Sequence, residues 1–360
     1  MRFSLFFFDG DGSNEATDRY RLLMDSARFA DEHEFDAVWT PERHFHAFGG
    51  LYPNPALTSA ALAMITQAVQ LRAGSLVLPL HHPVRVAEDW SVIDNLSQGR
   101  AALAVASGWT MDEFVLSRDP HGARRRLMWR SLEQIRKLWR GESVKFEDAG
   151  GREVDVKTLP KPIQKELPIW VTCQSTETFL EAGRLGFNVL TSLLAGTLDD
   201  VVERVARYRE ALESNGYDPY EYRVSLMLHT FLGDNEDQVK QDIREPFCEY
   251  LKTHYGLLET FAQAMGLEIS LDDFSDDDLE SLLNFGVEGF MQQRSLIGTP
   301  DGCAPFVREL EEKGIDEICC LIDFLQDYDS VMGALPHLGE LKRLCGGKKS
   351  PVRESNVVSV

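Results

Sequence analysis

Apolar and polar positions follow two alternating patterns along almost the entire chain. Some segments repeat apolar residues every three or four positions, as at Val201, Val205, Tyr208 and Leu212, which predicts amphipathic helices. Between them lie short, uninterrupted apolar runs, which are typical of parallel strands covered on both faces. We predict eight such strands, at residues 3–8, 36–39, 74–78, 101–106, 169–172, 188–191, 224–232 and 318–322.

Eight strand–helix units predict a (β/α)₈ TIM barrel of the α/β class, although an open, doubly wound sheet would show the same alternation. A barrel needs about 250 residues, so the 360-residue chain carries surplus sequence. Much of it lies at 233–299, which we expect to be a long insertion between strands seven and eight that acts as a mobile lid. We therefore expect a single barrel domain over residues 1–345 and a flexible tail over 346–360.

The charge balance argues against two classes of partner. Lys and Arg number 37 against 58 Asp and Glu, a formal net charge of −21, so general binding to nucleic acid or to an anionic membrane is not expected. No apolar run reaches the ~18 residues of a membrane-spanning helix. Six cysteines without a CxxC pair favour neither a disulfide framework nor a zinc ribbon, and a reducing cytoplasm is the expected compartment.

The residues just after the predicted strands are candidates for the active site, because a barrel of this kind carries its site at the carboxyl ends of its strands. Their small and polar side chains favour a flat polar ligand, although loops are polar in any fold. The candidates are Glu42, Arg43 and His44 after strand two, Gly74 and Ser75 within strand three, Ser107 and Gly108 after strand four, and Gln174 and Ser175 after strand five.

Histidine pairs raise the question of a metal site. His44 and His46 flank one phenylalanine, and His81 and His82 are adjacent. Barrel metallohydrolases use such a pair together with His and Asp ligands from later strands. Of the later histidines only His229 lies on a predicted strand, so we expect no metal site.

The segment after strand five has the features of a phosphate site. If Ser175 caps the following helix, Thr178 falls at its third position, so two hydroxyls lie beside unpaired amide groups and the positive end of the helix dipole. Arg125, from a run of three arginines, would bind the same phosphate through two parallel hydrogen bonds. An ordinary helix cap and a solvated arginine face explain the same residues, and both interpretations stay open at this point.

Several motifs occur in order along the chain. They are Phe-Asp-Ala-Val-Trp at 35–39 with Glu-Arg-His-Phe at 42–45, Val-Leu-Pro at 77–79 with His-Pro-Val-Arg at 82–85, Asp-Asn-Leu-Ser-Gln-Gly-Arg at 94–100, and Gly-Thr-Pro at 298–300. Together, at matching spacing, they resemble the bacterial luciferase-like flavin-dependent monooxygenases over roughly residues 1–345. No single motif is decisive, but the ordered set is specific.

The resemblance implies a (β/α)₈ barrel that binds reduced FMN, supplied by a separate flavin reductase, and reacts it with dioxygen. It implies that Gly74-Ser75 lies at the isoalloxazine ring, at a junction where relatives often hold a non-prolyl cis peptide, and that Ser107-Gly108 lies beside the ring. The residues expected at the ribityl phosphate are Arg125, Gln174, Ser175 and Thr178. A homodimer is also expected, and the segment before Gly298 corresponds to the family's mobile loop.

The chain departs from luciferases at several site positions. Luciferases carry two adjacent histidines after the strand-two Glu, and the first is catalytic; here Arg43 stands at that position and His44 remains. Ala106 replaces the family's reactive thiol, and Ser107 replaces a basic phosphate contact. These changes argue against light emission from long-chain aldehydes. The segments at 42–46 and 106–109 resemble more closely a subgroup found with polyketide and nonribosomal peptide pathways, that is, with secondary metabolism.

As a hypothesis, dioxygen adds to the reduced flavin to give a flavin hydroperoxide, which the closed barrel mouth protects from water and which oxygenates an organic substrate. His44 is the leading candidate for proton transfer, Arg43 would stabilise an anion, and Glu42 completes the catalytic group. The substrate is a small molecule, either free or tethered to an acidic carrier protein that docks on the basic stretch 124–140. The alternatives are a deazaflavin-dependent hydride-transfer enzyme on the same scaffold and a non-catalytic flavin-binding protein.

Overall fold

The computed structural model describes residues 1–8, 18–46, 49–193, 196–252, 289–291, 294–325 and 327–346, with the backbone alone at 251–252. The expected lid at 233–299 falls only partly within these ranges, since 253–288 and 292–293 lie outside the described residues. The expected flexible tail lies outside them from residue 347 onward. The barrel and its carboxyl-terminal strand ends fall largely within them.

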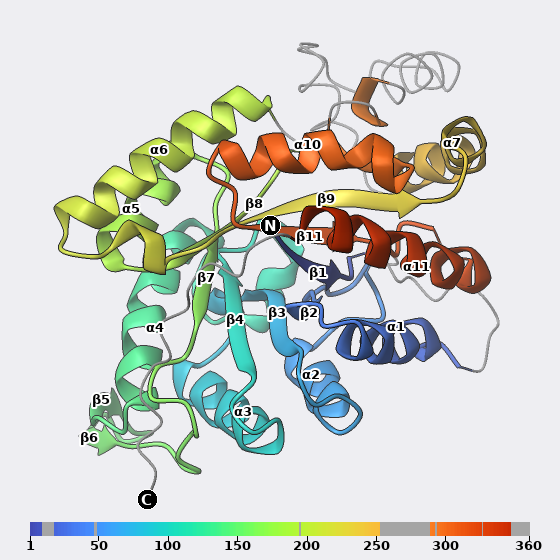
Figure 1. Ribbon diagram of the computed structural model, residues 1–360. Helices are drawn as coiled ribbons and strands as arrows, with labels where there is room; N and C mark the ends of the chain where they lie inside the picture. The colour runs from blue at the N-terminus through green and yellow to red at the C-terminus, as the bar shows by residue number, and fades with distance from the viewer. Residues whose placement is uncertain are drawn as a thin grey trace, which may run out of the picture.

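Eight parallel strands close into a barrel, as predicted (Figure 1). Each strand pairs with the next along the chain, and pairing of β8 with β9 and of β11 with β1 completes the circle. The open, doubly wound alternative is therefore excluded. The barrel strands are β1 (Arg2–Phe6), β2 (Ala37–Thr40), β3 (Gln70–Val77), β4 (Ala101–Ala106), β7 (Ile169–Thr172), β8 (Asn188–Ser192), β9 (Val224–Leu232) and β11 (Glu317–Leu321).

Helices surround the strands, as Figure 1 shows. The predicted stripe of α6 is buried at all four positions, and Thr197 forms a capping box with Asp200 at the start of that helix. Thr299 caps α10 with a proline in the first turn, as the sequence predicts. The helices are α1 (Arg21–Glu32), α2 (Pro55–Ala63), α3 (Pro83–Leu96), α4 (Arg124–Trp139), α5 (Thr176–Leu185), α6 (Leu198–Ser214), α7 (Glu236–Lys252), α10 (Pro300–Glu312) and α11 (Tyr328–Cys345).

Short elements lie between these units. The insertion between the seventh and eighth barrel strands contributes α7 and the strand β10 (Leu296–Gly298), which pairs in parallel with the end of β9. An antiparallel hairpin that the sequence did not predict, β5 (Val144–Glu147) with β6 (Glu153–Val156), follows α4. The short 3₁₀ helices in the described ranges are η1 (Leu78–Leu80), η2 (Asp112–Leu116), η3 (His121–Ala123) and η4 (Pro219–Glu221).

The third strand begins earlier than predicted, at Gln70 instead of residue 74. Gln70 and Arg72 interrupt the apolar run there, which hides the strand from a hydrophobicity pattern. Arg72 is nevertheless buried, because its guanidinium Nη1 lies 2.9 Å from both carboxylate oxygens of Glu317 on β11. The partner is distant in sequence, so no local pattern reveals that this arginine belongs inside a barrel.

Large side chains fill the barrel interior away from the carboxyl ends of the strands. The guanidinium of Arg72 lies between the rings of Trp39 and Trp170, 4.5 and 4.3 Å from their centroids. Trp170 donates its indole N–H to Ser225 Oγ, and the Ser225 hydroxyl donates to Glu317 Oε2 at 2.8 Å. Arg72, Trp170, Ser225 and Glu317 lie in the first halves of their strands, so this layer fills the interior away from the carboxyl ends.

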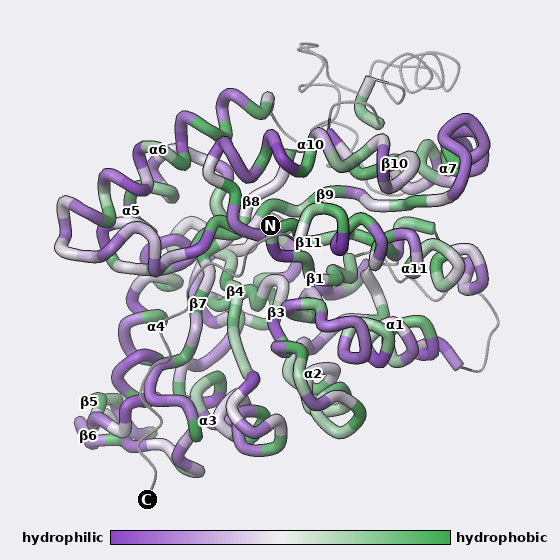
Figure 2. Tube along the Cα trace, viewed as in Figure 1, coloured by the Kyte–Doolittle hydropathy of each residue, from purple (hydrophilic) through white to green (hydrophobic). Residues whose placement is uncertain are grey.

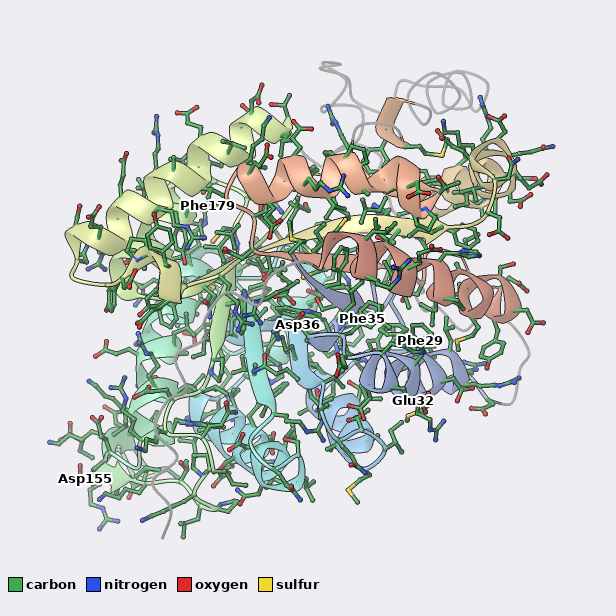
Figure 3. All side chains as sticks on the ribbon, in the orientation of Figure 1. Phe29, Glu32, Phe35, Asp36, Asp155 and Phe179 are labelled. Carbon is green, nitrogen blue, oxygen red and sulfur yellow. The ribbon has the colours of Figure 1, made fainter. Side chains whose placement is uncertain are left out.

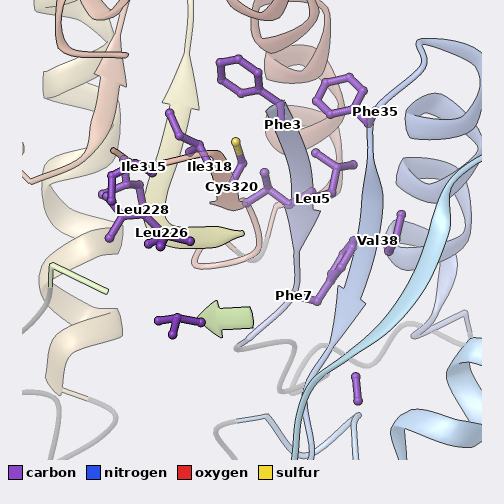
Figure 4. Packing of buried hydrophobic residues seen from close by; sticks show 14 of the residues in the cluster. Phe3, Leu5, Phe7, Phe35, Val38, Leu226, Leu228, Ile315, Ile318 and Cys320 are labelled. Carbon is purple, nitrogen blue, oxygen red and sulfur yellow. The ribbon is translucent and has the colours of Figure 1, made fainter. Parts of the chain in front are cut away.

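The larger apolar core lies between the barrel and the helices. Alternate residues of β1 separate the two layers: Phe3 and Leu5 belong to the outer core, whereas Phe6 packs inside the barrel. Figure 4 shows Leu5 of β1 near Val38 of the neighbouring strand β2, with which it pairs. Hydrophobic positions gather along the strands (Figure 2), and charged side chains such as those of Glu32 and Asp155 are exposed at the surface (Figure 3).

No helix within the described ranges is both long enough and apolar enough to cross a bilayer.

Candidate active site

Glu42 and His44 lie at the carboxyl end of β2, where the chain leaves the barrel. The Glu42 side chain is fully buried, and the His44 side chain is 13% exposed. Glu42 Oε1 lies 2.9 Å from His44 Nε2, and Glu42 Oε2 accepts a 2.6 Å hydrogen bond from the backbone N–H of Val77 at the end of β3. The carboxylate therefore fixes both the imidazole and the neighbouring strand end.

The hydrogen bond between Glu42 and His44 favours the charged form of each group. It raises the pKa of His44 above its ordinary value, although burial acts in the opposite direction. Burial alone would raise the pKa of Glu42, but the hydrogen bonds from His44, His81 and the Val77 backbone lower it. The arrangement combines a carboxylate base that stays ionised with an imidazole that readily holds an added proton.

Arg43 projects into a different environment from its two neighbours. Its guanidinium lies 4.6 Å from the ring centroid of Phe8 and 5.2 Å from that of Trp109. Burial lowers its pKa, and the nearby carboxylate of Glu113 opposes that shift. Gly49 leaves the space that the side chain occupies, since a Cβ there would lie 2.4 Å from Arg43 Cγ. Arg43 is thus a partly desolvated cation at the barrel mouth.

Gly74 and Ser75 lie in β3 and are joined by a cis peptide bond, as the resemblance implied. Gly74 packs against the barrel interior, because a Cβ there would lie 2.7 Å from Phe6 Cζ. The hydroxyls of Ser75 and Thr172 are 2.5 Å apart, which joins the ends of β3 and β7 across β4. A small hydroxyl therefore stands where the resemblance places the flavin ring.

Ser107 and Gly108 directly follow β4. Gly108 has a φ of +82°, and a Cβ there would lie 2.9 Å from Val77 Cγ1, so both conformation and space require glycine. Val77 also binds Glu42 through its backbone N–H. The residues after β4 are therefore neighbours of the Glu42 group across the end of β3.

The expected phosphate residues gather at the N-terminus of α5. Ser175 is the N-cap, and its Oγ lies 3.4 Å from the Thr178 backbone nitrogen and 3.1 Å from Thr178 Oγ1. Gln174 donates its side-chain N–H to Ser192 Oγ at 3.0 Å, which connects this turn to the end of β8. Hydroxyls, a side-chain amide and unpaired helix amides form a donor set that suits a phosphate.

Arg125 is exposed near the start of α4, and its charge reaches the first turn of α5. The pKa of Glu177 in that turn is lowered first by backbone and Ser175 hydrogen bonds and also by Arg125. Glu177 is the acidic residue whose negative charge would interact with the positive end of the helix dipole when no anion is bound. Ser175 and Thr178 thus share the start of α5, and Arg125 is near enough to affect Glu177 in the same turn. These side chains suit a phosphate group.

Sequence reasoning missed two titratable residues that join this site. His81 Nε2 lies 2.6 Å from Glu42 Oε1. Glu113 Oε1 accepts a 3.4 Å hydrogen bond from the His44 backbone, and burial raises the Glu113 pKa in spite of nearby Arg43. The two adjacent histidines after strand three could have indicated His81, but in the sequence they were considered only as possible metal ligands. Nothing in the local sequence points to Glu113.

An apolar cavity occupies the other half of the mouth, at the ends of β1, β8, β9 and β11. Its empty volume, which includes space open to solvent, is about 370 Å³. His229 forms part of its wall and lies 3.1 Å from the Tyr250 hydroxyl. Burial lowers the pKa of His229 to about 3, so its imidazole is neutral at ordinary pH. The lining residues are Phe8, Ser192, Met227, His229, Tyr250, Phe290, Arg294 and Leu321.

The part of the chain that the structure describes contains no set of side chains suited to binding a metal ion. No group of three or more His, Cys, Asp or Glu side chains there is arranged to hold an ion. Glu42, His44 and His81 share hydrogen bonds instead.

Comparison with known proteins connects this geometry to a family. Residues 1–317 match the model of the luciferase-like monooxygenases. The chain is 27% identical over 349 residues to the oxygenase component of a flavin-dependent trigonelline monooxygenase from Acinetobacter baylyi, covering 94% of this chain and 93% of the relative.

Solved structures share the fold at lower identity. The oxygenating constituent of 3,6-diketocamphane monooxygenase from Pseudomonas putida, a type II Baeyer–Villiger enzyme in complex with FMN, superposes with a TM-score of 0.77 at 20% identity and covers 98% of this chain and 100% of its own. A secondary alcohol dehydrogenase that depends on coenzyme F420 has a TM-score of 0.69 at 14% identity, covering 96% and 98%. The match to the family model over most of the chain shows that this protein belongs to the luciferase-like monooxygenase family.

Proposed function

We propose that the protein is the oxygenase component of a two-component monooxygenase. It takes reduced FMN from a separate flavin reductase and uses dioxygen to oxygenate an organic substrate. The observation that carries this proposal is the meeting of two groups at one end of the barrel. Hydroxyls at the N-terminus of α5 suit a phosphate, and the Glu42–His44 pair just after β2 suits proton transfer.

The chain's own residues bind and orient the cofactor. Ser175, Thr178, Gln174 and Arg125 would hold the phosphate of FMN by hydrogen bonds and charge. The ring would rest against Gly74, Ser75, Ser107 and Gly108, where small side chains leave a flat surface. Reduced flavin, when bound, supplies the electrons that activate dioxygen.

Three residues handle charge and protons at the mouth. His44 exchanges a proton with the reacting groups, and Glu42 holds its imidazole in one orientation. Arg43 stabilises an anion, because a cation that is partly removed from water attracts negative charge more strongly. The apolar cavity around His229 and Tyr250 would take the apolar part of the substrate.

The partners follow from the same proposal. The trigonelline relative is named an oxygenase component, which supports a separate reductase. A homodimer is supported by α2 and α3, which lie side by side (Figure 1) and expose Leu57, Met64, Val92 and Leu96. The substrate is a free small molecule or one bound to an acidic carrier protein, since α4 has a basic surface. A natural-product intermediate fits the sequence subgroup that the chain resembles.

Two measurements test the reaction type. Anaerobic titration with reduced FMN and with reduced coenzyme F420 should show tighter binding of FMN. Aerobic turnover with reductase, NAD(P)H and candidate substrates under ¹⁸O₂ should place one labelled oxygen in a product, as mass spectrometry detects. Hydride transfer with the deazaflavin would contradict the proposal, and so would flavin binding without oxygenated product for any of the substrates.

The role of His44 is tested in the same assay. His44→Asn should reduce turnover about 10²-fold or more, because general acid–base catalysis typically contributes 10²–10⁴-fold. The dissociation constant of reduced FMN should stay near that of the wild type, since His44 lies apart from the α5 N-terminus. Wild-type turnover in this variant would remove His44 from the mechanism.

A further inference from the structure

His81 has a position that the proposed roles do not use. It follows η1, and His82 is the next residue. His82 caps α3 by accepting a hydrogen bond from the Val84 backbone, and its ring packs against Phe146 of β5. His81 turns the other way and places Nε2 2.6 Å from Glu42 Oε1. The two adjacent histidines therefore differ: His82 caps the start of α3, and His81 contacts the buried carboxylate.

Glu42 Oε1 is shared by two imidazoles. His44 Nε2 lies 2.9 Å from this oxygen on one side, and His81 Nε2 lies 2.6 Å from it on the other. The second oxygen, Oε2, is held by the Val77 backbone N–H. One carboxylate oxygen thus bridges two ring nitrogens at hydrogen-bond distance, which is a continuous path for a proton.

The two ends of this path lie in different places. His44 is at the barrel mouth and its side chain is 13% exposed, Glu42 is fully buried, and the His81 side chain is 28% exposed. His81 also lines an open polar cavity between η1, α4 and β5, outside the barrel, whose empty volume of about 960 Å³ includes space open to solvent. The buried carboxylate therefore separates the reaction site from a water-accessible cavity.

We propose that His81 is the outer member of a proton path, His44–Glu42–His81, that connects the barrel mouth with solvent. The proposal deepens the proposed oxygenase function and rests on it. In a monooxygenase reaction one oxygen atom enters the substrate and the other leaves as water, so protons must reach a mouth from which bulk water is excluded. A path through side chains supplies those protons without admitting water.

The transfer conserves protons and charge. The inward transfer starts with Glu42 ionised, His81 protonated at Nε2 alone and His44 protonated at Nδ1 alone. His81 gains a proton at Nδ1 from water in the cavity and releases its Nε2 proton to Glu42 Oε1. Glu42 passes that proton to the free His44 Nε2, and His44, then doubly protonated, donates its Nδ1 proton at the mouth. Glu42 ends as a carboxylate and both rings end neutral, His81 protonated at Nδ1 and His44 at Nε2. The reverse sequence carries a proton outward, and a second inward transfer requires each ring to turn over first.

The other charged groups near the path do not replace His81. Glu113 contacts the His44 backbone and faces Arg43, so it lies on the mouth side. On the cavity side, Asp119, Arg130, Lys145 and Glu147 line the wall with His82. Among the described residues only His81 both lines this cavity and contacts Glu42. The pH dependence of the path must therefore be assigned by variants of His81 itself.

The test uses His81→Gln, which retains a side-chain N–H for Glu42 but cannot relay a proton, with His82→Gln as the matched control in the same cavity. The first measurement is on the ligand-free protein with ¹⁵N-labelled histidine. Exchange of the His44 Nε2 proton with water should slow at least several-fold in His81→Gln and stay unchanged in His82→Gln. Unchanged exchange in His81→Gln would overturn the proposal, whether or not the protein proves to be an oxygenase.

The second measurement is on the FMN-loaded enzyme. His81→Gln should lower turnover about ten-fold or more and enlarge the solvent isotope effect, with unchanged affinity for reduced FMN. His81→Ala should regain turnover when free imidazole is added, because the open cavity admits a small base. Loss of turnover without rescue by imidazole and without a change in the isotope effect would show that His81 only supports the structure, which contradicts the proposal.

Discussion

Glu42 makes three hydrogen bonds at its buried carboxylate, with His44, His81 and the Val77 backbone. These bonds overcome burial and keep its pKa below the ordinary value. The same interaction raises the pKa of His44. The charged imidazole therefore contributes stability that is complete below its ordinary pKa of 6.5 and is lost as pH rises through the raised folded value.

Glu42→Gln should therefore lower the pKa of His44, because the neutral amide no longer stabilises the imidazolium. Histidine NMR titration of the ligand-free protein measures this pKa directly. In the variant, the loss of unfolding free energy above pH 6.5 should also become smaller. Glu133→Gln, on the exposed surface of α4, serves as the control and should change neither quantity. An unchanged His44 pKa in Glu42→Gln would contradict the geometry described here.

The sequence predicts part of this site and not the rest. Glu42 and His44 follow one strand two residues apart, so their proximity is local information. His81 lies 39 residues from Glu42, and Glu113 lies 69 residues from His44. Such contacts depend on how the strand ends are arranged around the barrel. The periodic pattern of apolar residues contains no information about that arrangement.

At the scale of elements, α5 shows how a local signal can have two functions. Ser175 caps the helix, and its hydroxyl and that of Thr178 also form part of the proposed phosphate site. Thr197 caps α6 in a similar way, but it follows β8 and has a capping box with Asp200. Both residues cap a helix, but only Ser175 belongs to the proposed phosphate site. Substitutions of the two can therefore separate helix capping from phosphate binding.

Ser175→Ala and Thr197→Ala should each lower the free energy of unfolding by about 1 kcal/mol, because both remove an N-cap. Only Ser175→Ala should weaken binding of reduced FMN, as fluorescence or calorimetric titration under anaerobic conditions would detect. If both variants bound FMN as the wild type does, Ser175 would be a helix cap and nothing more.

The strands and helices of the barrel were predicted well where the pattern is apolar and periodic. β4, β7 and β9 begin and end at the predicted residues. The start of β3 was missed because Arg72 is polar, although it is buried. The β5–β6 hairpin was missed because each strand has only four residues, of which two are exposed and charged, so neither forms an apolar run.

At the scale of the whole molecule, barrel closure places a charged pair in the interior. Arg72 and Glu317 are fully buried and come from β3 and β11, which are not neighbours in the barrel. Arg72→Met should lower the free energy of unfolding by about 3–5 kcal/mol, because it leaves a buried carboxylate without its main partner. Urea denaturation measures this loss.

Arg2→Met is the matched control for Arg72→Met. Its ion pair with Asp36 has the same 2.8–2.9 Å geometry, but both side chains are partly exposed. Its loss should cost about 1 kcal/mol or less. Equal losses in the two variants would show that burial does not set the strength of the Arg72 pair.

The proposed homodimer is tested through α2 and α3. Leu57 and Val92 are 69% and 43% exposed, and a charge at either position should disfavour an apolar interface there. Leu57→Glu with Val92→Glu should halve the mass measured by light scattering. Tyr220→Glu, at a side chain 94% exposed in η4, should leave the mass unchanged. A dimer that survived the double substitution would place the interface elsewhere.

The proposed function depends most on where the reduced cofactor binds. A crystal structure of the protein with reduced FMN, prepared without oxygen, tests this directly. We predict phosphate oxygens within hydrogen-bond distance of the Ser175 and Thr178 hydroxyls, with the Arg125 guanidinium facing them and the ring beside Gly74-Ser75. A phosphate bound away from the N-terminus of α5 would contradict the account.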